Sequence, residues 1–285
     1  MSTDEAGPDR LYRAVDLRRQ GWSKRDIARA VREGVLISVR RGVYMHAGAD
    51  RDCILAARNS GRLGCVSSLR RVGVFVLRSD ELHVHFERGT RKAAVARGAS
   101  IWHWRPLLRC PHPRTTVVDV IDAVAQAIEC QPPRAAIATI DSALQLRLID
   151  EDDLDEIFAG VSPRRRVLRR FVDGRAESGP ETLVRLIALM LGFEVELQKW
   201  FAGVGRVDLV LDGWLVVECD SAQFHSGWEA QKRDRRRDVA LAAMGLASLH
   251  VIAEDILYHP ERVVASLRGI REARLRGFPG AAGRG

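Results

Sequence analysis

The stretch RVDLVLDGWLVVECD, residues 206–220, decides the fold of the C-terminal third of the chain. Val and Leu dominate both sides of Asp212-Gly213, a dipeptide typical of tight hairpin turns. The pattern therefore predicts two antiparallel strands with Asp208, Glu218 and Asp220 set among apolar residues. Burying a carboxylate is costly unless it is paired, hydrogen-bonded or bound to a cation. These three acids are therefore the strongest functional signal in the sequence.

How the three acids meet depends on the turn. Glu218 and Asp220 are two residues apart, so they share one face of their strand. A two-residue turn would place Asp208 opposite Val217 and put Glu218 on the other face. A three-residue turn with Gly213 in the left-handed region would place Asp208 opposite Val216 and gather the acids. Gathered carboxylates suit Mg²⁺ or Mn²⁺, and such an ion can promote phosphodiester hydrolysis. Alternatively, the acids cap backbone amides or pair with Arg206.

The segments around this hairpin predict helices and further strands. Ser178-Gly-Pro-Glu181 has the form of a capping box with proline in the first turn, which predicts a helix start. The segment 193–197 alternates as a strand, and 247–252 is a further strand. Glu181 therefore lies at the start of a helix that precedes the hairpin.

These ordered motifs resemble the PD-(D/E)XK nuclease superfamily, and more narrowly the uncharacterised domain family grouped with very short patch repair endonucleases. The resemblance covers about ninety residues from Ser178 onward. It rests on the following motifs: Ser178-Gly-Pro-Glu181-Thr-Leu, Arg206-Val-Asp208, Val217-Glu218-Cys-Asp220, His225, Arg233-Asp234 and Arg237-Asp238, Leu241 and Gly245. It implies a mixed sheet flanked by helices.

The resemblance also implies roles for individual residues. Asp208 and Glu218 would be metal ligands, and Glu181 a helix-borne ligand acting directly or through water. His225 would transfer a proton or contact phosphate. Asp220 completes the catalytic set but occupies the superfamily's lysine position, so Lys232 or Arg233 would have to supply positive charge. Ser221 stands where the narrower family commonly has glycine.

The N-terminal residues predict two helices followed by a hairpin. The pattern predicts a helix over 11–19, and Gly21 stops the helical pattern. Ser23-Lys-Arg-Asp26 then caps a second helix. The β-rich segments 35–39 and 43–45 flank Arg40-Arg-Gly. This is the layout of a winged helix-turn-helix DNA-binding domain. The predicted nucleic-acid contacts are Lys24, Arg25, Arg29, Arg40 and Arg41, with Arg233 and Arg237 in the C-terminal part.

The same N-terminal segment resembles the winged domain of abortive-infection (type IV) antitoxins. The resemblance covers about forty residues, and its motifs are Gly21-Trp-Ser, Ile27-Ala, Gly34-Val-Leu and Arg40-Arg-Gly-Val-Tyr44. It implies DNA binding or a protein contact. The alternative is a small domain used for packing or dimerisation.

Composition favours a polyanionic partner. The 285 residues include 45 Lys or Arg against 37 Asp or Glu, a formal charge of +8, and the sequence pI is about 9.8. Basic residues cluster in 10–41, 164–175 and 232–237, which favours nucleic acid. No signal peptide or membrane span is apparent, so a cytoplasmic protein is expected. The five cysteines form no Cys-x-x-Cys pair, and neither a disulfide framework nor a structural zinc site is predicted.

The middle of the chain predicts short strands over 82–86 and 101–104 and helices over 115–128, 133–146 and 151–158. His83 and His85 share a strand face, and His103 could lie on the neighbouring strand. No cysteine or carboxylate stands at ligand spacing beside them, so we expect surface histidines and no metal there.

The expected fold class is α/β, α+β overall. The predicted divisions are a winged helix-turn-helix over 9–48, a mixed α/β middle domain over 50–160, a basic helical linker over 161–177, a restriction-endonuclease-like domain over 178–272 and a Gly/Arg-rich tail over 273–285.

The predicted function is a DNA-binding phosphodiester hydrolase, endonuclease-like and dependent on Mg²⁺ or Mn²⁺, that acts on duplex DNA in phage defence or DNA repair. The alternative is a non-catalytic, antitoxin-like transcriptional regulator whose nuclease-like domain is only a scaffold. A third hypothesis is an interaction module with a toxin or antitoxin partner protein.

Overall fold

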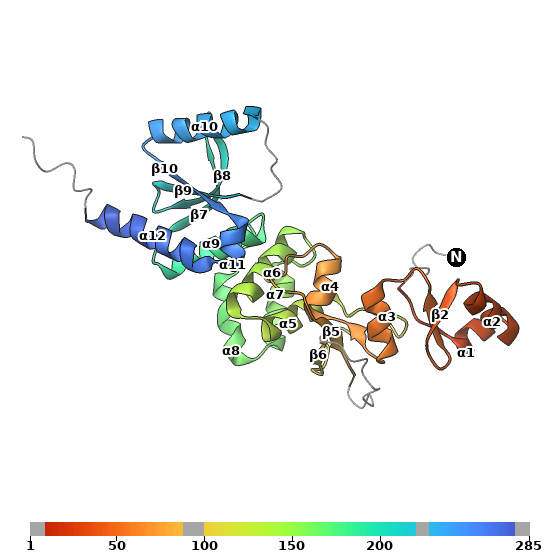
Figure 1. Ribbon diagram of the computed structural model, residues 1–285. Coiled ribbons are helices and arrows are strands. Elements are labelled where there is room, and N and C mark those ends of the chain that lie inside the picture. Colours follow the sequence, from red (N-terminus) through yellow and green to blue (C-terminus); the bar gives the residue numbers. More distant parts are fainter. Residues whose placement is uncertain (1–8, 88–99, 221–227, 277–285) are drawn as a thin grey trace, which may run out of the picture. The chain divides into compact units, whose positions relative to one another are not determined.

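The computed structural model describes residues 9–87, 100–220 and 228–276, and these form a mixed α/β protein of the α+β kind (Figure 1). The predicted fold class is confirmed. The described chain divides into two compact units. The first unit takes the described residues up to 132 together with 146–169, and the second takes 133–145 and the described residues from 170 on. The helix over 133–145 was predicted to belong to the middle domain, but it belongs to the second unit.

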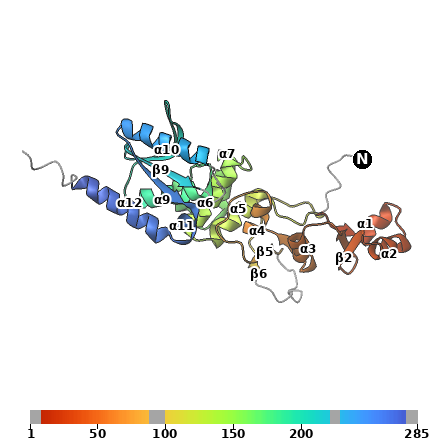
Figure 2. The same ribbon diagram turned by 45° about the horizontal axis from the view of Figure 1, so that its top comes forward.

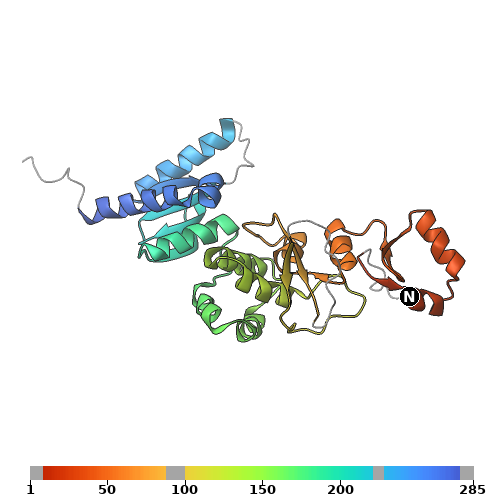
Figure 3. The same cartoon turned by 60° about the horizontal axis from the view of Figure 1, so that its bottom comes forward.

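The N-terminal elements of the first unit follow the predicted order, with one exception. Residues 12–13, predicted as helical, form a short strand instead, because they pair with Tyr44 and Val43. The elements are β1 (Tyr12–Arg13), α1 (Ala14–Arg19), α2 (Lys24–Arg32), β2 (Leu36–Arg40) and β3 (Val43–His46). Ser23 and Asp26 form the predicted capping box at the start of α2. Both helices lie beside the hairpin, and the apolar side chains of Leu17, Ile27 and Leu36 pack together (Figure 3).

The rest of the first unit holds a second small sheet of order β4-β5-β6, in which β5 and β6 are parallel. The strands are β4 (Arg62–Leu63), β5 (Leu82–His85) and β6 (Ser100–His103). The helical segments are α3 (Arg51–Arg58), α4 (Cys65–Arg71), α5 (Val120–Cys130), α7 (Glu151–Gly160) and α8 (Pro163–Arg166). A 3₁₀ segment over Val167–Phe171 spans the boundary between the two units. The predicted strands are confirmed, whereas the helix predicted from residue 115 begins only at Val120, because Asp119 caps it.

The second unit is built on a four-stranded sheet of order β10-β9-β8-β7. The strands are β7 (Val195–Phe201), β8 (Gly205–Leu211), β9 (Leu215–Asp220) and β10 (Ala247–Ile252), and only the β10–β9 pair is parallel. The helices are α6 (Pro133–Gln145), α9 (Gly179–Met190), α10 (Trp228–Ala243), α11 (Ala253–Tyr258) and α12 (Pro260–Leu275). The helix α10 covers one face of the sheet, and α9 and α12 lie on the other (Figures 1 and 2). The implied mixed sheet flanked by helices is therefore present.

A buried ion pair joins α6 to α9. The Asp141 carboxylate is 1% exposed and accepts hydrogen bonds from Arg185 Nη2 at 2.8 Å and from Thr182 Oγ1 at 2.9 Å. The backbone N–H of Asp173 donates to its other oxygen at 2.8 Å. Burial raises the pKa of Asp141 to about 6, although Arg185 opposes this shift. Removing either partner would leave a buried charge uncompensated.

None of the helices that the structure describes has the length and apolar character needed to cross a membrane.

Candidate functional site

The β8–β9 turn sets which acids face one another. Leu211 pairs with Leu215, so three residues form the turn, with Asp212 and Gly213 both in the left-handed region at φ 48° and 72°. The expectation that a three-residue turn puts Asp208 opposite Val216 is wrong. Because Leu209 pairs with Val217, Asp208 stands opposite Glu218. Residues opposite one another on an antiparallel pair point to the same face.

The two carboxylates replace backbone carbonyls at the point where regular pairing of β8 and β9 ends. The N–H of Asp208 donates to Glu218 Oε2 at 3.2 Å, and the N–H of Cys219 donates to Asp208 Oδ2 at 2.8 Å. The alternative in which acids accept backbone N–H groups is thus partly correct. Each acid bonds across the pair, so both side chains are held in the gap between the two strands.

Glu181 approaches this pair from the first turn of α9. The N–H of Glu181 donates to Ser178 Oγ at 3.3 Å, but the reciprocal half of the predicted capping box is replaced. Glu181 Oε2 instead accepts from the N–H of Glu177 at 2.8 Å and from Gln198 Nε2 at 2.7 Å. Burial raises the pKa of Glu181, and the negative charge of Asp208 adds to the shift. Glu181 therefore lies close enough to Asp208 for the two charges to repel.

Gln198 is a site residue without a sequence signal. In the β7–β8 register it falls opposite Asp208, between the pairs Leu197–Leu209 and Lys199–Val207. Its backbone is in the left-handed region at φ 54°, which is costly for a non-glycine residue. Strained residues of this kind persist where the surrounding structure fixes them, often at functional sites. Here the side chain fixes the orientation of Glu181.

Arg237 of α10 is the basic group that reaches the acids. Its Nη2 lies 2.7 Å from Glu218 Oε1 and also donates to the carbonyl of Arg206. Burial and repulsion from Asp208 raise the pKa of Glu218 to about 7 even though Arg237 opposes the shift. Burial also raises the pKa of Asp208. Glu181 and Glu218 are only 5% and 7% exposed as whole residues, so water screens their charges poorly. A cation bound here would therefore reduce the repulsion between the carboxylates.

The carboxylates are nevertheless spread more widely than a compact ligand set. Among the described residues, one group of His, Cys, Asp or Glu side chains has all its ligand atoms within 4.8 Å of one another, and it lies in the first unit. The carboxylates of Glu181, Asp208 and Glu218 do not meet this criterion. Asp208 and Glu218 form the central pair, and Glu181 lies on its flank.

The other predicted catalytic residues have different surroundings. Asp220 is exposed, and its Oδ2 lies 3.2 Å from His250 Nδ1. Lys232 is half-buried and Arg233 exposed on α10, whereas Arg237, predicted as a DNA contact, is the residue that bonds Glu218. His225 and Ser221 lie outside the described residues. Sequence reasoning did not single out His250, which stands opposite Glu218 in the parallel β10–β9 pair.

The surroundings of His250 should make the free energy of unfolding depend on pH. Its two ring nitrogens lie 3.2 Å from Asp220 and 3.0 Å from Asp238, and these hydrogen bonds and charges raise its pKa against an opposing burial effect. The folded state thus holds the proton more tightly. The stabilisation is complete below the ordinary pKa of 6.5 and is lost as pH rises through the raised value.

Replacing His250 by Gln should therefore flatten the fall in unfolding free energy between pH 6 and pH 8. The expected difference is below about 1 kcal/mol, because the pair is partly exposed. Urea unfolding of both proteins across this range measures it. A variant whose pH profile runs parallel to that of the wild type would contradict the assignment.

The predicted DNA contacts of the first unit lie largely at the surface. Lys24, Arg25, Arg29 and Arg41 are exposed, and Arg29 also pairs with Asp26 at 3.0 Å. Arg40 is half-buried, and burial together with the charges of Arg13 and Arg62 lowers its pKa. A pocket of about 360 Å³ is also present, lined by Arg10, Arg13, Asp16, His112, Pro113 and Arg114. Such grouped cations favour an anionic ligand.

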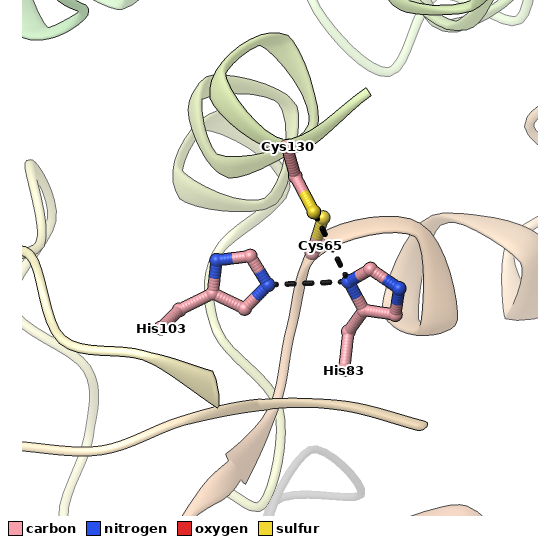
Figure 4. Close-up of side chains that lie close together, drawn as sticks. All are labelled: Cys65, His83, His103 and Cys130. Atoms are coloured by element: carbon pink, nitrogen blue, oxygen red, sulfur yellow. Dashed lines mark hydrogen bonds between the residues drawn. The ribbon is translucent and has the colours of Figure 1, made fainter. Parts of the chain in front are cut away.

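A second cluster of reactive side chains lies in the first unit. Cys65, His83, His103 and Cys130 place one ligand atom each within 4.8 Å of all the others (Figure 4). His83 Nδ1 is 3.2 Å from His103 Nε2 and 3.8 Å from Cys130 Sγ. Hydrogen bonds from Cys65 and the two histidines lower the pKa of the Cys130 thiol, whereas burial raises that of Cys65.

The expectation that these histidines have no cysteine near them is wrong. The two cysteines are far apart in the sequence, and the packing of α4 and α5 beside β5 brings them together. His83 is buried rather than at the surface. His85 is buried too, but it lies outside the cluster and contacts Gln126 Nε2 at 3.3 Å, and burial lowers its pKa to about 4.

Comparison with known proteins gives relatives without a described function. No known protein-family profile matches the chain. Two uncharacterized proteins of Mycobacterium tuberculosis, from strains CDC 1551 / Oshkosh and H37Rv, are each 32% identical to it over 167 residues, which is 54% of this chain and 61% of the relative. The chain thus matches less than two thirds of the length of these curated relatives.

Proposed function

We propose that this protein is a DNA-directed phosphodiester hydrolase that depends on Mg²⁺ or Mn²⁺ and acts in the cytoplasm, with the second unit as its nuclease domain. One observation carries the proposal: half-buried Asp208 and buried Glu218 stand opposite each other where β8 and β9 separate, and each accepts a hydrogen bond from a backbone N–H of the other strand. Glu181 comes to their flank from a helix, as the resemblance to PD-(D/E)XK nucleases implies. Oxygen ligands of this kind suit both ions.

In this proposal Asp208 and Glu218 hold the ion, and Glu181 contributes directly or through water. A bound divalent ion would supply activation of water and stabilisation of charge on the phosphodiester. Gln198 keeps Glu181 turned toward the strands through its 2.7 Å hydrogen bond. A bound cation would also offset the burial and the repulsion from Asp208 that together raise the pKa of Glu218 to about 7.

Arg237 supplies the positive charge that the superfamily's lysine would provide. Its side chain is 34% exposed, so part of it reaches solvent while Nη2 bonds Glu218. Guanidinium groups bind phosphate oxygens with paired hydrogen bonds. We therefore assign Arg237 the role of contacting the phosphate beside the carboxylate pair, in place of Lys232 or Arg233.

The second candidate is a DNA-binding regulator, antitoxin-like and without catalytic activity, which acts alone or with a toxin partner. The Arg237–Glu218 ion pair favours it, because an internal cation can satisfy the acids without a metal. The two candidates differ in one respect: only the hydrolase needs Asp208 and Glu218 as ligands.

A cleavage assay tests the hydrolase. The purified chain is incubated with supercoiled, linear duplex and single-stranded DNA in Mg²⁺, in Mn²⁺ and in EDTA. We expect cleavage with either ion and none in EDTA. Binding of duplex DNA without cleavage under all these conditions would favour the regulator instead.

Both candidates predict that the hairpin between β2 and β3 contacts the DNA backbone. Replacing Arg40 and Arg41 together by Ala should weaken duplex binding on the order of tenfold at 0.1 M salt, and lower the slope of log affinity against log salt by about two. The matched control replaces Arg51 and Arg78, two exposed arginines outside this hairpin, by Ala. Fluorescence anisotropy across a salt series measures both. Equal losses in the two double variants would mean that only net charge matters.

A further inference from the structure

We propose that Cys65, His83, His103 and Cys130 form a structural Zn²⁺ site in the first unit, separate from the carboxylate pair of the proposed hydrolase. The four ligands come from four elements (Figure 4): Cys65 is the first residue of α4, His83 lies on β5, His103 ends β6 and Cys130 ends α5. A metal here would join both parallel strands to two helices.

The distances fit tetrahedral coordination. Zn²⁺ binds imidazole nitrogen at roughly 2.0–2.1 Å and thiolate sulfur at roughly 2.3 Å, so in a tetrahedron two nitrogens lie about 3.3 Å apart, and a nitrogen and a sulfur about 3.6 Å apart. The two imidazole nitrogens are 3.2 Å apart, and Cys130 Sγ lies 3.8 Å from His83 Nδ1. Both distances are close to the tetrahedral values, and all four ligand atoms lie within 4.8 Å of one another.

The surrounding residues hold the ligands in place. The backbone of Cys65 is in the left-handed region at φ 50°, and its N–H donates to the buried side chain of Gln126 at 3.0 Å. A Cβ added at Gly64 would come 2.6 Å from Gln126 Oε1, so a larger residue would push the Gln126 side chain away from the N–H of Cys65. The N–H of His83 donates to Ser67 Oγ at 2.9 Å. A strained residue fixed in this way is a frequent feature of ligand positions.

The donor set selects the metal and its role. Two thiolates and two imidazoles suit Zn²⁺, whereas Mg²⁺ and Mn²⁺ prefer oxygen ligands. Binding would release the two thiol protons, and the two thiolates would balance the charge of the ion. Four protein ligands complete a tetrahedron and leave no position for substrate, so the site stabilises the fold rather than performing catalysis.

Metal analysis tests the site. The full chain is purified under reducing conditions, loaded with Zn²⁺, freed of loose metal by dialysis and analysed for zinc. We expect about one tightly held zinc per chain in the wild type. Loading with Co²⁺ instead should give the visible absorption of tetrahedral cobalt with thiolate ligands. A wild-type chain that retains no zinc would overturn the proposal.

Variants locate the metal within the chain. Cys130→Ser and His103→Gln change the two less buried ligands and should each lose the zinc and the cobalt spectrum. The controls Cys110→Ser, at an exposed thiol, and Asp208→Asn, in the second unit, should keep both. Retention of zinc in both ligand variants would overturn the assignment, and its loss in Asp208→Asn would do so as well. Because Asp208→Asn tests the proposed hydrolase, the two proposals can fail independently.

A chelator supplies a measurement that does not depend on whether the variants fold. 1,10-Phenanthroline, added with Mg²⁺ present, should lower the thermal midpoint of the wild type and leave that of Cys130→Ser unchanged. Wild-type protein that resists zinc loading would also be analysed by mass spectrometry. A disulfide between Cys65 and Cys130 in that protein would contradict the metal site.

Discussion

Asp208→Asn should reduce metal-dependent DNA cleavage by at least about a hundredfold, because charge stabilisation by a bound ion contributes several kcal/mol and each 1.36 kcal/mol is a factor of about ten. The substitution keeps an oxygen that accepts the N–H of Cys219 and removes the negative charge. Duplex binding measured in EDTA should be unchanged, since the substitution alters neither Arg237 nor the predicted contacts of the first unit. Initial cleavage rates in Mg²⁺ and Mn²⁺ measure the effect.

The same hairpin offers a matched control. Asp212 lies in the turn, is exposed and accepts the N–H of Glu194 at 2.8 Å. Asn tolerates the left-handed conformation of this residue and keeps the acceptor. Asp212→Asn should therefore cleave DNA like the wild type. Equal rates for the wild type and Asp208→Asn would remove Asp208 from the catalytic site.

Arg185→Leu should lower the free energy of unfolding of the second unit by about 3–5 kcal/mol, the usual cost of removing one partner of a buried ion pair. Leu would leave the Asp141 carboxylate in a buried position with only Thr182 and the N–H of Asp173 as donors. Urea unfolding monitored by circular dichroism measures the loss.

The double variant Arg185→Leu, Asp141→Asn separates charge from packing. It removes the uncompensated charge, so it should recover part of the stability lost by Arg185→Leu. A loss below about 1 kcal/mol for the single variant, or no recovery in the double variant, would mean that the pair does not hold α6 to α9.

Local patterns predicted much of the fold, since the signals lie within a few residues. The Ser23–Asp26 capping box, the hairpin around Arg40-Arg41-Gly42 and the strand over 247–252 are all present. The acids among apolar strand residues lie on β8 and β9, and these strands form the predicted antiparallel hairpin. In each case the residues that carry the pattern are also those that form the element.

What was missed depends on contacts between distant segments. The exact partner of Asp208 follows from which residues close the turn, and a difference of one residue changes it. Gln198 reaches the acids from β7 and has no local signal. Arg237 was predicted as a DNA contact, but its ion pair with Glu218 depends on how α10 packs against the sheet. Cys65 and Cys130 meet only because α4 packs against α5. The pairing of residues 12–13 with β3 likewise overrides a helical pattern.

Mn²⁺ binding tests the central claim most directly, because Mn²⁺ can be followed by electron paramagnetic resonance or calorimetry without DNA. The wild type should bind Mn²⁺ saturably, and Cys130→Ser should do the same, since its altered thiol belongs to the separate zinc site. Asp208→Asn should lose this binding. Binding that is absent from the wild type, or unchanged in Asp208→Asn, would contradict a metal site at Asp208 and Glu218.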